Sequence, residues 1–244
     1  MHFDLSLIVF ILGLIIGSFL NVCIYRIPKG LSIITPGSFC PICRHPLSWK
    51  DNIPILSFLF LKGRCRYCGG KISYQYPIVE LVTGSVFLLF YLKFGLTLSF
   101  FIYIIIFSLL FVSMFIDLRY MVLPDTLIIP SIILSGINAF LYGFPYNLLA
   151  GGIFALIFYI LRVIFKEGLG LGDIELIVII SMMLGFYDTL LVTIISSLGG
   201  SIYGLYLIKK GRAQLRTRIP FGPFLISSFI IVSLGNGLIF YPLH

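Results

Sequence analysis

The stretch GLGLGDIE at residues 168–175 opens an apolar run that continues to Leu184. It places two acids, Asp173 and Glu175, at the mouth of a segment that is otherwise entirely apolar. An ionised aspartate at the centre of a membrane helix costs about 2.5 to 3.5 kcal/mol on the insertion scale, so acids in such a place need a reason. The glycines let the backbone bend and approach a neighbour closely. A second stretch, IDLRYMVLPD at residues 116–125, also closes one apolar run and opens another, and we expect its acids to meet the first pair across a helix bundle.

The composition is that of an integral membrane protein. Hydrophobic residues fill 59% of 244 positions and charged residues 11%, and the mean hydropathy is +1.12, far above the usual range of soluble domains. The net charge of +8 does not indicate nucleic-acid binding here, because basic residues of membrane proteins collect in cytosolic loops. No basic residue precedes the apolar run that begins at Leu5, so we expect a retained membrane helix and no cleaved signal peptide.

Eight apolar runs predict an all-α polytopic protein with about eight transmembrane helices. About 20 apolar residues are needed to cross a hydrocarbon core of about 30 Å. The run from 174 to 208 is too long for one crossing helix, so we predict a hairpin that turns near residues 185–188. The eight runs are residues 5–25, 77–91, 96–116, 126–141, 148–165, 174–184, 189–208 and 221–240.

The distribution of basic residues predicts the orientation. The loop from Arg26 to Lys71 holds eight Lys and Arg and a single acid, Asp51. The positive-inside rule places this loop in the cytosol and the N-terminus outside. With eight spans threaded in this way, only Lys93 of the 17 Lys and Arg lies outside. Four acids then lie at the cytosolic membrane boundary: Asp117, Asp125, Asp173 and Glu175.

Two CxxC pairs in the cytosolic loop predict a structural zinc site. Cys40 and Cys43 form one pair and Cys65 and Cys68 the other, with 21 residues between the pairs. Four thiolates satisfy tetrahedral zinc, and such a closed site is structural and not catalytic. The alternatives are two disulfides or four unrelated thiols, and a reducing cytosol argues against disulfides. We therefore expect three parts: a first transmembrane helix at residues 1–25, a small cytosolic zinc module at 26–75 and a transmembrane domain at 76–244.

The acids favour protease chemistry. Two close aspartates cannot both ionise cheaply, so such a pair holds one proton near neutral pH. One carboxylate then acts as a general base on water while the other acts as an acid toward a peptide carbonyl, as in aspartyl proteases. Each acid also has a structural reading: a helix cap for Asp125, neutralisation by Arg119 for Asp117, stabilisation by a helix dipole for Asp173, and head-group contact or pairing with a base for Glu175.

A proton-coupled transporter is the alternative from another functional class, because intramembrane acids also serve proton transport. Transporter acids usually lie near the membrane midplane on broken helices related by inverted repeats. The acids of this chain lie at one membrane face, beside a metal module, which counts against transport.

The sequence resembles the type IV prepilin peptidases, a family of bifunctional leader peptidases and N-methyltransferases with GxGD-type aspartyl chemistry. The resemblance implies that Asp117 and Asp173 are the catalytic pair. It also implies a multi-pass protein of the cytoplasmic membrane that cleaves prepilins or pseudopilins after a glycine, on the cytosolic side, and then methylates the new N-terminus with S-adenosylmethionine. Six stretches carry the resemblance: GSFLNVCIYRIP (17–28), the two CxxC pairs, ISYQYPIVELVTG (72–84), IDLRYMVLPD (116–125), GLGLGD (168–173) and IPFGPFL (219–225).

One position departs from the family pattern. Many members carry a lysine two positions after the GxGD aspartate, whereas Glu175 stands here, where it either acts on the protonation of the dyad or contacts the basic leader of the substrate. No glycine-rich loop for S-adenosylmethionine is evident, so methyl transfer rests on the resemblance alone. Its expected region is the loop 26–75, bordered by Asn21, Arg26 and Glu80. A peptidase without methyl transfer is the second reading.

Overall fold

The computed structural model describes residues 2–165, 169–211, 214, 217 and 219–239. These residues form helices joined by short loops, and the described part of the chain contains no strand beyond two isolated bridges. The chain divides into two compact units, Met1–Ile104 and Ile105–His244, with the boundary inside one helix. The expected all-α architecture is confirmed.

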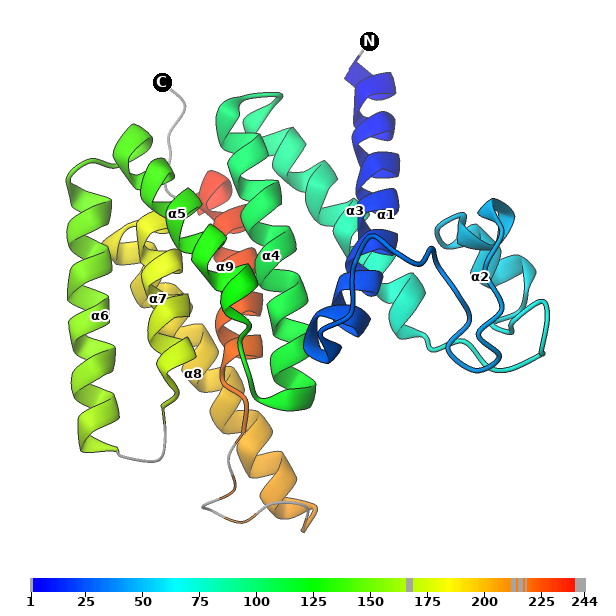
Figure 1. Cartoon of the computed structure of the whole chain (residues 1–244). Helices are drawn as coiled ribbons and strands as arrows, with labels where there is room; N and C mark the ends of the chain where they lie inside the picture. The colour runs from blue at the N-terminus through cyan, green and yellow to red at the C-terminus, as the bar shows by residue number, and fades with distance from the viewer. Residues whose placement is uncertain (1, 166–168, 212–213, 215–216, 218, 240–244) are drawn as a thin grey trace. The chain divides into compact units, whose positions relative to one another are not determined.

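The first unit is built on two long helices that pack along each other, α1 and α3. Glycines make the close packing possible, because a Cβ atom at Gly13 or Gly17 would lie 2.7 Å from the Cα atom of Gly84 or Glu80, respectively. Small residues at a helix crossing are typical of membrane helix pairs. The elements of this unit are α1 (His2–Arg26), η1 (Ile27–Lys29), η2 (Trp49–Asn52), α2 (Leu56–Phe60), α3 (Gln75–Phe94) and the first residues of α4 (Leu98–Tyr120) (Figure 1).

The second unit is a bundle organised around α7, which packs against α5, α6, α8 and α9. Helix α7 is apolar on all sides, and Leu176, Ile177, Ile179 and Ile180 are fully buried, as expected for a helix that other helices surround. The elements are the rest of α4, α5 (Asp125–Tyr142), α6 (Tyr146–Ile164), α7 (Leu171–Leu184), α8 (Phe186–Lys209) and α9 (Gly222–Ile239) (Figure 1).

Helices lie at all eight apolar runs that the sequence marks. In the described residues, six of them are long and apolar enough to cross a membrane, namely α1, α3, α4, α5, α6 and α8, so the chain is a multi-pass membrane protein. Helix α7 has only 14 residues. The apolar segment Gly222–Gly235 of α9 is also shorter than these six helices. The predicted hairpin is confirmed: α7 ends at Leu184 and α8 begins at Phe186, with Gly185 between them at φ +80°.

Buried hydroxyl groups are satisfied inside the helices that carry them. Thr83, Ser131, Ser181 and Thr189 each donate a hydrogen bond to the backbone carbonyl four residues earlier, at 2.6 to 2.8 Å. Among the described residues, no buried side-chain nitrogen or oxygen lacks a partner. Such self-contained bonding suits helices in lipid, where water does not reach the polar groups.

Candidate functional site

The four cysteines predicted to bind zinc come together in the first unit. Their sulfur atoms all lie within 4.8 Å of one another, and the Sγ atoms of Cys40 and Cys68 are 4.0 Å apart. Tetrahedral zinc with bonds of about 2.3 Å would place its sulfur ligands about 3.8 Å apart. Cys43 and Cys65 complete the set, and all four are free thiols. The donor set therefore fits a zinc ion, and the disulfide alternative is not adopted.

The two CxxC pairs lie in equivalent backbone turns, a local repeat that sequence reasoning missed. In the first turn, the N–H of Cys40 donates to the carbonyl of His45, and the N–H of Arg44 donates to the carbonyl of Cys40. The second turn makes the same two bonds with Cys65, Gly69 and Gly70 in the corresponding places. Each turn is closed by an isolated antiparallel bridge. Each pair of thiols is thus positioned by its own local backbone.

The backbone also prepares the second turn to supply a thiolate. The N–H groups of Cys68 and Tyr67 lower the pKa of the Cys65 thiol to about 7. For Cys68, the N–H of Gly70 lowers the pKa, but burial and the neighbouring thiols outweigh it and raise the value to about 11. The Cys65 thiol therefore loses its proton easily. The positive charge of a metal ion would displace the protons of the other thiols.

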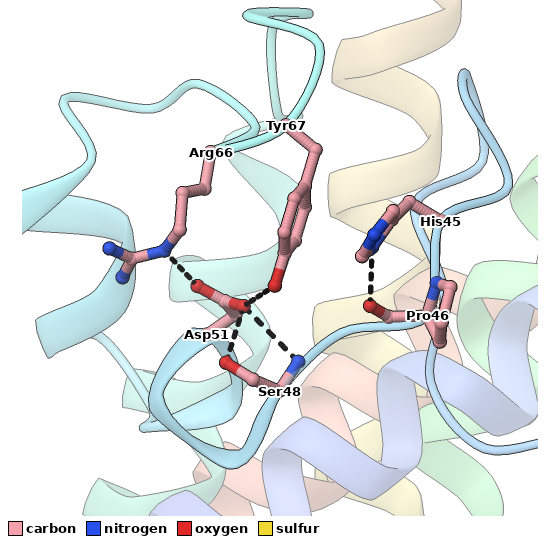
Figure 2. A network of polar contacts seen from close by, with 6 residues as sticks. All are labelled: His45, Pro46, Ser48, Asp51, Arg66 and Tyr67. Atoms are coloured by element: carbon pink, nitrogen blue, oxygen red, sulfur yellow. Dashed lines mark hydrogen bonds and ion pairs between the residues drawn. The ribbon is translucent and has the colours of Figure 1, made fainter.

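Asp51, the only acid of the basic loop, attaches the η2 segment to the second turn. Arg66 donates from Nε to Oδ1 at 2.7 Å, while the hydroxyls of Tyr67 and Ser48 donate to Oδ2 at 3.1 and 2.7 Å. Figure 2 shows these groups converging on the carboxylate, with His45 nearby, whose ring stacks on Tyr67 at 3.7 Å. Burial alone would raise the pKa of Asp51, but these hydrogen bonds lower it to about 2. Sequence reasoning gave Asp51 no role, although a lone acid in a basic loop was a usable signal.

The two candidate catalytic aspartates come together in the second unit. Asp117 lies in the last turn of α4 and is only 7% exposed, and Asp173 lies in the first turn of α7. The two carboxyl groups are near enough to interact electrostatically. Asp173 accepts the backbone N–H of Gly170 at 2.9 Å, and Asp117 accepts the backbone N–H of Gly222, which opens α9. Three helix ends therefore form the site.

Glycines make room for this cluster. A Cβ atom at Gly222 would lie 2.6 Å from Oδ2 of Asp117, and one at Gly172 would lie 2.5 Å from Cδ1 of Leu123. Real Cβ atoms do not approach other atoms so closely, so a larger residue at Gly172 would force the Leu123 side chain to move, and one at Gly222 would force the Asp117 carboxylate or α9 to move. The two motifs GLGLGD and IPFGPFL thus meet at one place, although Gly168 of the first lies outside the described residues. Sequence reasoning quoted Gly222 within a motif without assigning it a contact.

The other two boundary acids form a second pair. Glu175 interacts electrostatically with Asp125. Asp125 is the first residue of α5, so the N-cap position belongs to Pro124, which makes no side-chain cap. The interpretation of Asp125 as a helix cap is therefore wrong, because the helix begins at Asp125 itself. The dipole interpretation of Asp173 agrees with its place in the first turn of α7 and with its bond to Gly170.

The three residues that border the cysteine loop attach it to α1 and α3. Arg26 is buried and donates to the carbonyl oxygens of Ser32 and Gly37, both at 2.9 Å. Asn21 donates to the carbonyl of Tyr76 at 3.2 Å. Glu80 accepts the backbone N–H of Ile55 at 2.8 Å through Oε2. Arg26 and Glu80 therefore hold the loop backbone, and Asn21 ties α1 to the start of α3 where the loop ends.

Comparison with known proteins gives a consistent result over nearly the whole chain. The family model of the Bacterial Peptidase A24 N-terminal domain matches residues 11–94, and that of the Type IV leader peptidase family matches residues 104–205. A protein of Bacillus subtilis (strain 168) named prepilin leader peptidase/N-methyltransferase is 36% identical over 236 residues, which cover 95% of each chain.

Two further relatives carry the same name. The protein of Myxococcus xanthus (strain DK1622) is 38% identical over 87% of this chain and 66% of its own length. The protein of Pseudomonas aeruginosa (strain PAO1) is 32% identical over 93% of this chain and 89% of its own. No solved structure matches the chain.

Proposed function

The chain belongs to the type IV leader peptidase family, and from that premise we propose that it cleaves the leader peptide of prepilins with Asp117 and Asp173 and methylates the new N-terminus. The observation that carries the peptidase proposal is the meeting of these two acids, from α4 and α7, beside backbone N–H donors at the end of a helix bundle. The names of the relatives support both activities.

The dyad would act through a shared proton. The ionised carboxylate takes a proton from a water molecule, whose oxygen attacks the scissile carbonyl carbon, while the protonated carboxyl gives its proton to the carbonyl oxygen. When the tetrahedral intermediate collapses, one of its hydroxyl groups returns a proton to the carboxylate that acted as the acid, the C–N bond breaks, and the leaving nitrogen takes the proton that the base received. The N–H groups of Gly170 and Gly222 hold the two carboxylates in place during these steps.

The substrate would be a prepilin or pseudopilin whose apolar helix lies in the bilayer and whose basic leader stays in the cytosol. This orientation rests on the loop Arg26 to Lys71, which carries eight basic residues and one acid, and on the positive-inside rule. The catalytic acids then lie at the cytosolic side of the cytoplasmic membrane, with the N-terminus outside.

Two cofactors are proposed, one that stabilises the cysteine module and one that supplies the methyl group. Zinc would be held by Cys40, Cys43, Cys65 and Cys68 and would supply folding energy to the module without taking part in the chemistry. S-adenosylmethionine would supply the methyl group. We place methyl transfer in the first unit, with the loop 26–75, because this region matches the N-terminal domain of the family, and we assign it to no single residue.

The test is an assay with a prepilin-like substrate and S-adenosylmethionine, followed by mass spectrometry of the product. Asp117→Asn and Asp173→Asn should each abolish cleavage while the protein accumulates normally. Asp188→Asn is the matched control, because this acid opens α8 near the far end of α7 from Asp173. Retained cleavage in either dyad variant would move the catalytic role to Asp125 or Glu175.

The same assay separates the two activities. A further methyl mass on the cleaved wild-type product establishes the methyltransferase, and cleavage without it identifies a peptidase that lacks methyl transfer. If folded wild-type protein cleaves no such substrate, the peptidase proposal fails and proton-coupled transport becomes the leading function for the acids.

A further inference from the structure

Helix α2 presents an apolar face to solvent that neither the metal site nor the peptidase explains. Leu56, Leu59 and Phe60 are 50%, 63% and 82% exposed. Their spacing of three and four residues places them on one side of the helix. Trp49, which is 74% exposed, belongs to η2, and η2 packs against α2. We call Leu56, Leu59 and Phe60 the α2 face. Single exposed apolar residues are ordinary, but a contiguous face usually marks an interaction surface.

Two contacts attach α2, and with it the α2 face, to the start of helix α3. The backbone N–H of Ile55, the N-cap of α2, donates to Oε2 of Glu80 at 2.8 Å. The ring of Phe58 packs against the ring of Tyr74 with 5.5 Å between centroids. Tyr74 immediately precedes α3, and Glu80 lies in its second turn.

Helix α3 is one of the helices long and apolar enough to cross a membrane. The two contacts attach α2 to the first two turns of α3, and therefore to the end of α3 at which its candidate membrane span begins. The attachment also explains how a helix of five residues can serve as an interfacial element, since its position does not depend on its own membrane affinity.

The charges around α2 suit an anionic surface. Lys50 precedes it, and Lys62 and Arg64 follow it, all exposed. The one acid of this region, Asp51, is already paired with Arg66 at 2.7 Å. Basic residues near a membrane surface are attracted to anionic lipids, and exposed tryptophan is typical of the membrane interface.

We propose that the α2 face is a membrane-docking surface that inserts into the head-group layer of an anionic leaflet, at the membrane side where α1 ends and α3 begins. The surrounding lysines and arginine bind the lipid phosphates, and Leu56, Leu59 and Phe60 enter the acyl boundary. The docking holds the cysteine module against the bilayer and not free in the cytosol. It does not depend on the peptidase or methyltransferase activity.

The experiment uses tryptophan depth measurements on the full chain, which contains only one tryptophan. Phe60→Trp in a Trp49→Phe background reports on the α2 face, and Ile42→Trp in the same background is the control. Ile42 is also exposed, at 62%, but lies in the first CxxC turn. Both variants are reconstituted into phosphatidylcholine vesicles with and without phosphatidylglycerol, and zinc content checks that the module is folded.

Docking predicts that the tryptophan at position 60 is quenched by brominated acyl chains and protected from aqueous acrylamide, more strongly when phosphatidylglycerol is present. The tryptophan at position 42 should stay accessible to acrylamide. Equal behaviour at both positions, or accessibility of position 60 to acrylamide alone, would overturn the proposal. Protection of position 60 from both quenchers would also overturn it, because a protein surface would then cover the face.

A second variant uses the native reporter. Leu59→Ser combined with Phe60→Ser leaves Trp49 in place and removes most of the α2 face. We expect Trp49 to lose its quenching by brominated lipid while bound zinc stays at the wild-type level. Unchanged quenching of Trp49 in this variant would show that the α2 face does not hold the module at the membrane.

Discussion

The cysteine module and the aspartate cluster reach their geometry in opposite ways. In the module, each pair of thiols is held by a turn whose hydrogen bonds close within a few residues, and Asp51 attaches the second turn to the neighbouring η2 segment. In the bundle, Asp117, Asp173 and Gly222 belong to three helices that are distant in sequence. The first site depends on local backbone and on a metal, whereas the second depends on how closely helices pack. Changes in the module should therefore act on stability, and changes in the bundle on the positions of reacting groups.

Apart from removal of the dyad acids themselves, the largest effect should come from filling the space beside the dyad. In Gly222→Ala, the new methyl group would meet Oδ2 of Asp117, at 2.6 Å in the present packing, and force the carboxylate or α9 to move. A displacement of about 1 Å at a reacting group can cost about 100-fold in rate, so we expect a loss of cleavage of that order. Gly136→Ala is the control, because a Cβ there meets nothing within 4 Å. Equal cleavage rates for the two variants would show that Gly222 does not position the dyad.

Loss of a sulfur ligand should come next, and it should act on the module. We expect Cys43→Ser to lose bound zinc and to make residues 26–75 sensitive to protease, since structural zinc contributes about 10 to 16 kcal/mol in finger peptides. Cleavage of prepilin should fall less than in the aspartate variants. Metal analysis and limited proteolysis measure both effects, with Cys23→Ala as the control, because Cys23 lies in α1 outside the cluster. Wild-type protein that contains no stoichiometric zinc would contradict the metal site.

The link that Asp51 makes between η2 and the second turn should have a smaller effect. Asp51→Asn removes the charge that accepts from Arg66, Tyr67 and Ser48, and we expect a loss of about 1 kcal/mol, or release of zinc to a chelator that is about fivefold easier. Lys50→Gln, at an exposed neighbour, should leave release unchanged. A wild-type release rate in Asp51→Asn would mean that each turn holds its thiols unaided.

The pKa of Asp51 gives this link a pH dependence. The folded pKa of about 2 lies below the ordinary value of 3.8, so the stabilisation is complete at neutral pH and is lost as the pH falls from about 4 to about 2. Asp51→Asn should remove this component at every pH, which a comparison of acid unfolding curves would detect.

The smallest effects should come from the residue with left-handed backbone in each cysteine turn. Arg44 and Gly69 occupy equivalent positions with φ of +58° and +69°, and this left-handed conformation is favourable only for glycine. Arg44→Gly should stabilise the module by about 0.5 to 1 kcal/mol, and Gly69→Ala should destabilise it by about 1 kcal/mol. Thermal unfolding followed by protease sensitivity would measure both. A destabilised Arg44→Gly would show that the arginine side chain makes a contact worth more than the backbone strain.

The sequence predicted the features that depend on neighbouring residues. The apolar runs marked eight of the nine α-helices in the described residues, all but the short α2, because a membrane helix must be apolar along its length. Gly185 interrupted the long run where one helix could not continue. The CxxC spacing indicated four converging thiols for the same reason, since each pair sits in its own turn. Asp173 was recognisable as an acid at the start of a helix.

Only the tertiary structure decided which distant groups meet. Nothing along the chain shows that Gly222 faces Asp117, that Glu175 faces Asp125, or that Asp51 binds Arg66 of the second cysteine turn. Nor does the sequence show that Glu80 holds the start of α2. Hydropathy and spacing determine which segments become helices and turns, because those depend on local burial and backbone geometry. The partners of a polar side chain depend on how those helices pack, and that packing is a property of the folded chain as a whole.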